Sequence, residues 1–351
     1  MLSFQNRIAL SLAAVPLLCA GLASAADTRA PLFLTATNGS TNYLATMNTR
    51  THQTSYIPTG GNGGASGNAG GIAVNGEMAA VINNGSRNVT IFVRVGDAMQ
   101  PMQLIKTLAA PLSVTFGQSH LVVLETTLAE SFPMFGNTVM TPADGSSPLQ
   151  LGDGSAAQIV AFNGGVIYSE KTGSVAELSL STDGAPGLSG PNVVVPLPPA
   201  PNNNTPFGIV ARDSNVYLTI AHSDIEALVQ NGKIVAMAEG PMPFMVSGNI
   251  IHAPCWNTLS GQFLFASDSP GQQILRYLVS DAGIFLDKIG VAALAGAPTD
   301  LFADGNLLAV IDGGNGSVSN ASVFEISSEG ELTLLFAVKI PSPINGAVIV
   351  N

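Results

Sequence analysis

The chain has 351 residues, is rich in glycine (38) and proline (22), and carries only 10% charged side chains, with a formal net charge of −11. This composition is typical of a soluble all-β protein with many turns. The acidic balance disfavours nucleic acid and anionic membrane surfaces as partners, because both repel negative charge.

The first 25 residues have the pattern of a signal peptide. Arg7 precedes an apolar run at residues 8–18, and Ala23-Ser24-Ala25 supplies small residues for cleavage. Lipidation at Cys19 is the alternative. No later stretch is long enough to cross a bilayer. We therefore expect a secreted protein, extracellular or periplasmic, in which residues 26–351 form a single domain and Cys255 remains without a disulfide partner.

A repeat of roughly 40 to 50 residues runs through residues 26–351. In each repeat, Pro, Gly or Ala opens an apolar strand, which is followed by a turn and a second strand. The opening residues are Gly71, Pro111, Ala157, Pro206, Pro254, Pro298 and Pro343. The last repeat is truncated, and its missing strands are expected at residues 32–37, 42–45 and 55–57. The pattern predicts an all-β, seven-bladed β-propeller closed by pairing of the N- and C-terminal strands, which removes exposed sheet edges.

Two stretches interrupt the repeat. Residues 60–71 form a glycine-dense loop that we interpret as a flexible rim, and residues 126–155 are interpreted as an irregular insertion. Long amphipathic helices are not predicted anywhere in the chain.

The alternating connections of a four-stranded blade place certain residues at one mouth of the central channel, where propellers commonly bind ligands. These are the residues at the ends of second strands and those just before each repeat begins. The candidates for this rim are Asn38, Asn83, Glu125, Ser169, His222, Asp268, Asp312 and His252, with the loop 60–71 beside them and Trp256 just inside.

Residues 253–268, beginning Ala-Pro-Cys-Trp-Asn and ending Phe-Ala-Ser-Asp, resemble a blade of the lactonase-fold seven-bladed propellers. Residues 70–85 and 298–312 are similar to other blades of that family, which includes 6-phosphogluconolactonase-like proteins and 3-carboxymuconate cyclase. The resemblance implies an exported protein that hydrolyses or forms a lactone of a small metabolite. This chain lacks the Pro-His segment and most of the arginines that active members use, so its substrate is expected to be neutral or weakly charged.

Lactone hydrolysis needs a base that activates water, and His252 with Glu125 is the catalytic pair that the rim offers. The structural alternatives are a solvated His252, a Glu125 that caps turn N–H groups, and a Trp256 that packs in the core rather than stacking on a ligand. We expect no cofactor and no metal site, a small-molecule ligand or surface partner, and a monomer. The competing hypothesis is a non-enzymatic secreted propeller that binds a ligand or a surface.

Overall fold

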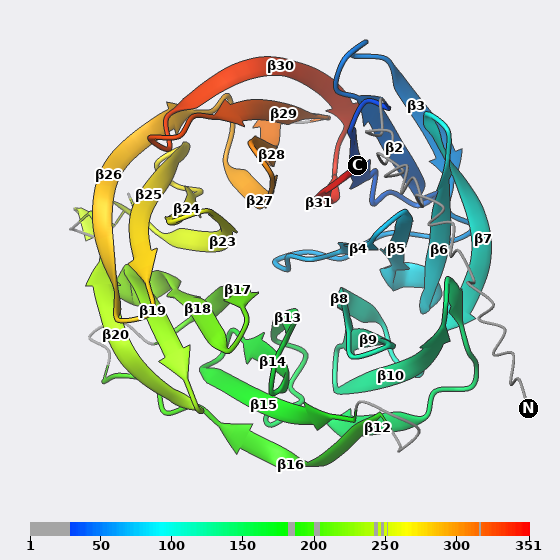
Figure 1. Cartoon of the computed structure of the whole chain (residues 1–351), viewed down its shortest axis with the longest axis horizontal. Coiled ribbons are helices and arrows are strands. Elements are labelled where there is room, and N and C mark those ends of the chain that lie inside the picture. The colour runs from blue at the N-terminus through cyan, green and yellow to red at the C-terminus, as the bar shows by residue number, and fades with distance from the viewer. Residues whose placement is uncertain are drawn as a thin grey trace, which may run out of the picture.

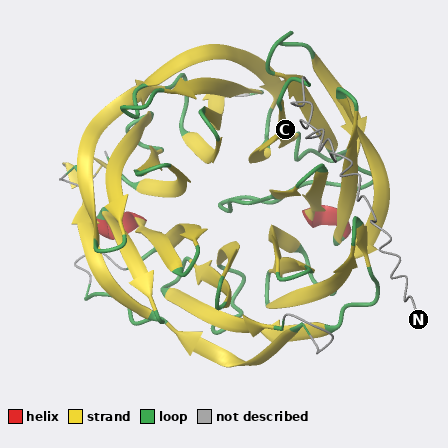
Figure 2. Ribbon diagram, viewed as in Figure 1, coloured by secondary structure: helices red, strands yellow, loops and turns green. Residues whose placement is uncertain are grey.

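The computed structural model describes residues 29–181, 187–199, 204–241, 245–246, 249–250, 252–315 and 317–351. The predicted signal peptide and Cys19 lie outside these residues. Within them, no helix is long and apolar enough to cross a membrane. Strands dominate, with two short 3₁₀ turns, η1 (Asn84–Ser86) and η2 (Ala221–Ser223), as Figure 2 shows.

Seven antiparallel sheets in the described residues form the blades of a ring (Figure 1). From the axis outward, blade 1 contains β4 (Ile72–Asn75), β5 (Met78–Asn83), β6 (Asn88–Val95) and β7 (Ala98–Lys106). Blade 2 contains β8 (Pro111–Gly117), β9 (His120–Glu125), β10 (Leu128–Phe135) and, both paired with β10, β11 (Thr138–Val139) and β12 (Gly145–Pro148). Blade 3 contains β13 (Ala156–Phe162), β14 (Gly165–Glu170), β15 (Ser174–Leu180) and β16 (Leu188–Val194).

The remaining blades repeat this order. Blade 4 contains β17 (Pro206–Arg212), β18 (Asn215–Ile220), β19 (Ile225–Gln230) and β20 (Lys233–Glu239), and a small hairpin of β21 (Met245–Val246) and β22 (Asn249–Ile250) follows it. Blade 5 contains β23 (Pro254–Ser260), β24 (Phe263–Asp268), β25 (Gln273–Ser280) and β26 (Gly283–Ala293). Blade 6 contains β27 (Pro298–Asp304), β28 (Leu307–Asn315), β29 (Val318–Ile326) and β30 (Leu332–Pro341).

Blade 7 is shared between the two ends of the chain, which confirms the predicted closure. Its inner strand is β31 (Asn345–Val350), and β1 (Leu32–Ala36), β2 (Tyr43–Asn48) and β3 (Thr54–Pro58) complete it. β31 pairs antiparallel with β1, with Leu32 opposite Val350. The side chain of Arg94 secures this seam, because Nη1 donates to the carbonyl of Val350 at 2.8 Å and Nη2 to that of Ala30 at 2.6 Å.

The inner strands begin where the repeat predicted. β8, β17, β23 and β27 start at the anchoring prolines, and β4 and β13 start within one residue of the predicted anchors. Proline is suited to the first position of a strand because it has no N–H to contribute to the ladder.

The interpretation of residues 126–155 as an irregular insertion is wrong, because they contain the third and fourth strands of blade 2. β10 includes Pro133, and β12 is the polar segment Gly-Ser-Ser-Pro, so neither has the alternating apolar pattern of a typical strand. β10 nevertheless pairs with β9 over residues 129–133, with Pro133 opposite His120 at the end of this register.

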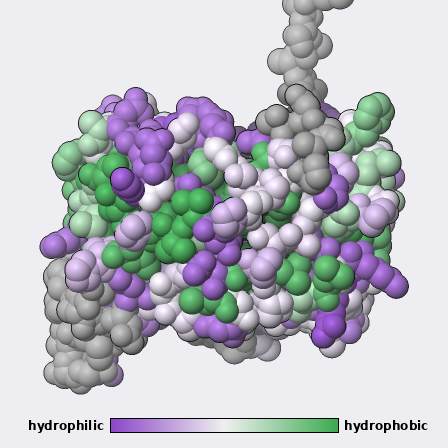
Figure 3. Space-filling view, turned by 90° about the horizontal axis from the view of Figure 1, so that it is seen from below, coloured by the Kyte–Doolittle hydropathy of each residue, from purple (hydrophilic) through white to green (hydrophobic). Residues whose placement is uncertain are grey.

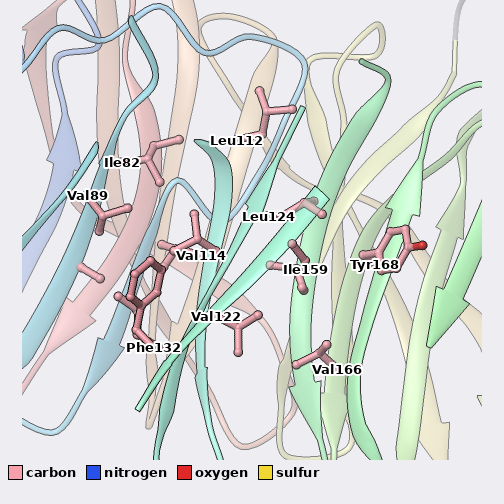
Figure 4. Close-up of a cluster of buried hydrophobic side chains, with 14 of the residues drawn as sticks. Ile82, Val89, Leu112, Val114, Val122, Leu124, Phe132, Ile159, Val166 and Tyr168 are labelled. Atoms are coloured by element: carbon pink, nitrogen blue, oxygen red, sulfur yellow. The ribbon is translucent and has the colours of Figure 1, made fainter. Parts of the chain in front are cut away.

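The core lies between the blades. Figure 4 shows the largest cluster, in which side chains from blades 1, 2 and 3, including Ile82, Val114, Phe132 and Tyr168, pack together. Exposed apolar side chains such as Val193 and Met237 lie on the outermost strands. Figure 3, which views the disc from its edge, shows apolar surface mixed with polar surface there.

Neighbouring inner strands are also joined by side chains. Ser113 Oγ accepts the N–H of Ile159 at 3.2 Å, Gln158 Oε1 accepts that of Ile209 at 2.8 Å, and Thr258 Oγ1 accepts that of Ala303 at 3.0 Å. Each acceptor belongs to one blade and each N–H to the next. These bonds satisfy edge N–H groups that face the channel rather than another strand.

Candidate functional site

Acidic side chains occupy the same position in several blades, on the second strand opposite the proline that opens the first. Glu125 lies opposite Pro111, Asp268 opposite Pro254, and Asp312 opposite Pro298. All three carboxyl groups belong to residues that are at most 1% exposed. The ring of acids that the sequence predicted at the channel rim is therefore buried beneath the connections between blades.

Glu125 binds the connection that precedes its own blade. It accepts the N–H of Ala109, while its neighbour Glu130 accepts the N–H of Leu108 at 3.0 Å. Burial raises the pKa of Glu125 to about 9, and a hydrogen bond to Glu130 adds to this effect. A buried carboxyl group that favours its protonated form and binds the connection before its own blade is suited to a structural clamp.

The two rim asparagines hold loops. Asn38 has a positive φ of 51°, and its side chain accepts the N–H groups of Gly64 at 2.7 Å and Ala65 at 3.1 Å. Asn83 is fully buried and accepts bonds from Asn42 at 2.9 Å and Thr59 at 2.6 Å. Asp312 likewise accepts a bond from Asn320, at 2.8 Å.

The loop 60–71, which connects blade 7 to blade 1, crosses the channel axis instead of lying on the rim. Figure 1 shows the segment before β4 projecting into the centre of the ring. The side chain of Lys171 in blade 3 donates to the carbonyl of Gly67 at 2.6 Å, and Asn345 in blade 7 donates to Asn68 at 3.0 Å. Asp300 in blade 6 accepts the N–H of Gly70 at 3.1 Å.

These bonds change the interpretation of the loop as a flexible rim. Ala65 and Ala69 are 5% and 1% exposed, so the loop is packed as well as hydrogen-bonded. Burial raises the pKa of Asp300 to about 7, while the N–H groups of Gly70, Leu301 and Ala347 stabilise its charged form. The loop closes the mouth of the channel at which the sequence predicted a ligand.

Below this loop, the channel contains a cavity of about 400 Å³. The inner strands line it from their middles towards their C-terminal ends, for example at Phe116, Arg212 and Ala303. The cavity therefore extends towards the opposite mouth. Gly70 of the loop 60–71 lines it, but none of the other predicted rim residues is among the described residues that do.

Trp256 packs in the core. It is 4% exposed, and its ring meets that of Phe207 edge-on with 5.0 Å between centroids. It belongs to an apolar cluster with Ala69 and Ala157, so its faces are covered by protein.

Two of the predicted rim residues do meet. His252 Nδ1 lies 2.8 Å from Asp268 Oδ2, and the His252 side chain is 22% exposed. Asp268 also accepts the N–H groups of Ala253 at 3.0 Å and Gly271 at 3.2 Å, and Gln273 Nε2 at 2.8 Å. Asp268 thus accepts four hydrogen bonds, one of them from the imidazole, so His252 Nδ1 is the donor and Nε2 carries the lone pair of the neutral ring.

The predicted pair of His252 and Glu125 has separate partners. Glu125 accepts the N–H of Ala109 just before blade 2 and lies beside Glu130, whereas His252 is bonded to Asp268 in blade 5. The structure thus combines His252 with Asp268, another of the three predicted rim acids.

Further buried polar groups lie beside this pair, between blades 4 and 5. Among the described residues, neither carboxylate oxygen of Asp224 has a hydrogen-bond partner, and Tyr277 Oη and Asn257 Oδ1 lack one too. Burial raises the pKa of Asp224 to about 7, with repulsion from Asp268 adding to the shift and attraction to His252 opposing it. An acid that titrates near neutrality next to an oriented histidine is typical of sites that transfer protons.

The described residues contain no group of three or more His, Cys, Asp and Glu side chains arranged as metal ligands. Cys255 is poorly suited to nucleophilic chemistry, because burial raises the pKa of its thiol to about 11. The imidazole of His252, oriented by Asp268 and partly exposed, is suited to acid–base chemistry.

Comparison with solved structures supports the same architecture. The chain superposes on a 6-phosphogluconolactonase-like protein from Bacteroides fragilis with a TM-score of 0.65 and 14% identity, covering 93% of this chain and 100% of that one. The periplasmic gluconolactonase of Pseudomonas aeruginosa gives a TM-score of 0.68 at 14% identity, covering 92% and 99%. The chain has the fold of the lactonase-like propellers.

Sequence comparison adds nothing to this. No family model matches the chain, and no curated protein matches it either. At 14% identity the structural likeness describes the fold alone.

One sequence signal could have indicated the role of the acids. The same 14-residue spacing separates Pro111 from Glu125, Pro254 from Asp268, and Pro298 from Asp312. A spacing that recurs with the blades indicates an architectural role. His252 stands out because it adds a partly exposed imidazole to one copy of this arrangement.

Proposed function

We propose that this chain is an exported, lactonase-like propeller that hydrolyses a small, uncharged lactone, with His252 as the general base and Asp268 as its positioning residue. The observation that carries the proposal is the 2.8 Å bond between His252 Nδ1 and a buried, four-fold hydrogen-bonded Asp268. This is the arrangement that orients a catalytic imidazole with its second nitrogen towards substrate.

The reaction uses one water molecule. His252 Nε2 takes a proton from water while the water oxygen forms a bond to the lactone carbonyl carbon. The ring C–O bond then breaks, and the imidazolium returns the proton to the departing alkoxide, which yields the hydroxy acid. The net charge of −11 and the acids around His252 favour an uncharged substrate.

Export is part of the proposal. It is supported by the apolar segment and small-residue cleavage site at residues 1–25, and one solved structure with the same fold is a periplasmic gluconolactonase.

The test is hydrolysis of a panel of uncharged γ- and δ-lactones by the purified chain. The rate is measured from the protons that the hydroxy acid product releases. General-base catalysis contributes about 10²- to 10⁴-fold, so His252→Ala should lower kcat/KM by at least about 100-fold. Asp268→Asn should also lower kcat, because the amide would favour the wrong tautomer of His252. His52→Ala is the matched control, since His52 stacks on Phe336 in the outer part of blades 6 and 7. Equal rates for wild type and His252→Ala would remove His252 from the mechanism.

A second function is favoured by the loop 60–71. Because this loop closes one mouth of the channel and the rim acids bind backbone, the scaffold also suits a non-enzymatic module that binds a ligand or a surface. Wild-type protein that is folded but turns over no lactone in the panel would favour this function.

A further inference from the structure

A second cavity lies away from His252, on the outer side of the ring where blades 6 and 7 meet. It has a volume of about 400 Å³, within the range of about 300 to 1,000 Å³ that small ligands occupy. We call it the hydroxyl groove, after the residues that line it: Thr37, Gly39, Ser40, Thr41, Tyr43, Tyr56, Pro341 and Ser342. In Figure 1 the end of β30 meets β2 and β3 in this region.

Two tyrosines form one wall of the hydroxyl groove. Tyr43 pairs with Pro58 and Tyr56 with Ala45 across the β2–β3 ladder. Residues that are paired across two strands share a face of the sheet, and so do residues two apart on one strand. Tyr56 is paired with Ala45, and Ala45 is two residues from Tyr43, so both tyrosine rings lie on the same face as diagonal neighbours. Ala45 on that face packs against blade 6, so the rings face the same neighbour. Tyr56 is 44% exposed, which leaves its ring accessible.

Hydroxyl groups dominate the rest of the surface. Six of the eight lining residues carry one, and none of the eight is charged. Thr37 Oγ1 accepts the N–H of Tyr43 at 3.0 Å and keeps its own proton for donation. Hydroxyl groups can both donate and accept, so they match a ligand whose own polar groups are hydroxyls.

We propose that the hydroxyl groove binds a neutral sugar. The C–H-rich face of a pyranose ring packs against Tyr43 and Tyr56, because a tyrosine ring offers a large, rigid apolar face next to a polar tip. The hydroxyls of Thr37, Ser40, Thr41 and Ser342 exchange hydrogen bonds with those of the sugar. A charged ligand would find no counter-charge among these residues, and an apolar ligand or a proline-rich peptide would leave most of the hydroxyls without a partner.

The test is titration calorimetry of the whole mature chain with glucose, galactose, mannose, N-acetylglucosamine and their disaccharides, with a decaproline peptide as the rival ligand. We expect saturable binding of at least one sugar, with Kd in the millimolar range or tighter. Tyr56→Ala should weaken that binding about tenfold or more, because it removes the apolar face against which the sugar ring packs. Tyr56→Phe, which keeps the ring, should change Kd by less than about threefold.

Two controls separate recognition from folding. Phe135→Ala removes another exposed aromatic ring, in blade 2, and should leave sugar binding unchanged. Thr41→Val replaces a hydroxyl by a methyl group of similar size and should weaken binding while the melting temperature stays constant. The proposal is overturned by a lack of saturable binding for every sugar, by Tyr56→Ala that binds like wild type, or by binding of decaproline alone. Because the groove is separate from His252, lactone hydrolysis can fail without affecting this result.

Discussion

Replacing Glu125 by glutamine should stabilise the protein at neutral and alkaline pH. Burial raises the pKa of Glu125 from 4.5 to about 9 in the folded state. The folded chain therefore keeps a proton that the unfolded chain releases above pH 4.5. The stability linked to this proton is fully present below pH 4.5 and is lost as the pH rises towards 9.

The magnitude follows from the interval of 2.5 pH units between 4.5 and 7. At about 1.4 kcal/mol per unit, keeping Glu125 protonated costs up to about 3–4 kcal/mol at pH 7. Glutamine removes this cost, because its amide oxygen can accept the N–H of Ala109 and its NH₂ group can donate to the neighbouring carboxyl group of Glu130.

The assay is urea unfolding at several pH values between 4.5 and 9. The advantage of Glu125→Gln over wild type should be near zero at pH 4.5 and should grow with pH. Glu170→Gln is the matched control at the end of the second strand in blade 3. Both carboxylate oxygens of Glu170 accept the N–H groups of Leu151 and Gly152, so an amide would oppose a donor there and cost about 1–3 kcal/mol. A Glu125→Gln variant that is less stable than wild type at pH 8, or a difference that does not vary with pH, would show that burial of the protonated carboxyl group is not what sets this stability.

Two further predictions concern the loop across the axis and the seam. A Cβ at Gly63 would lie 2.2–2.4 Å from backbone atoms of Asn38, so Gly63→Ala should lower the free energy of unfolding by about 1–3 kcal/mol in thermal or urea unfolding. Gly39→Ala is the control: its Cβ would have its nearest atom at 3.6 Å, so it should cost about 1 kcal/mol or less. Equal effects of the two substitutions would contradict the packing of the loop. Arg94→Met should lower the free energy of unfolding by about 3–5 kcal/mol, because it removes two charge-assisted hydrogen bonds to the carbonyl groups of Ala30 and Val350. Amide hydrogen exchange should increase first in β1 and β31. Unchanged protection there would show that the side chain does not hold the seam.

The ring of blades could be predicted from sequence because its signals are local and repeated. Prolines opened the inner strands at regular intervals, and the truncated repeat at the C-terminus had its missing strands at the N-terminus. The strands β10 and β12 were missed because Pro133 and the segment Gly-Ser-Ser-Pro weaken the alternating pattern.

The site could be predicted only in part. The sequence predicted His252 and Asp268 at the same rim, but it paired His252 with Glu125. Positions along a strand do not reveal that the Glu125 side chain binds a backbone N–H while Asp268 binds the imidazole. The path of the loop 60–71 was also beyond reach, because its glycines carry no periodic signal and its bonds to Lys171, Asp300 and Asn345 join distant parts of the chain.

The bonds between inner strands have a direction. Ser113, Gln158 and Thr258 each accept an N–H from the following blade, so blades 2, 3 and 5 each complete the inner edge of their successor. A substitution at Gln158 should consequently be felt at Ile209, one blade further round the circle, as much as in its own sheet. At these junctions, gain or loss of a whole repeat would preserve the pairing. A whole repeat brings both its own side-chain acceptor and the backbone N–H that the acceptor of the preceding blade binds.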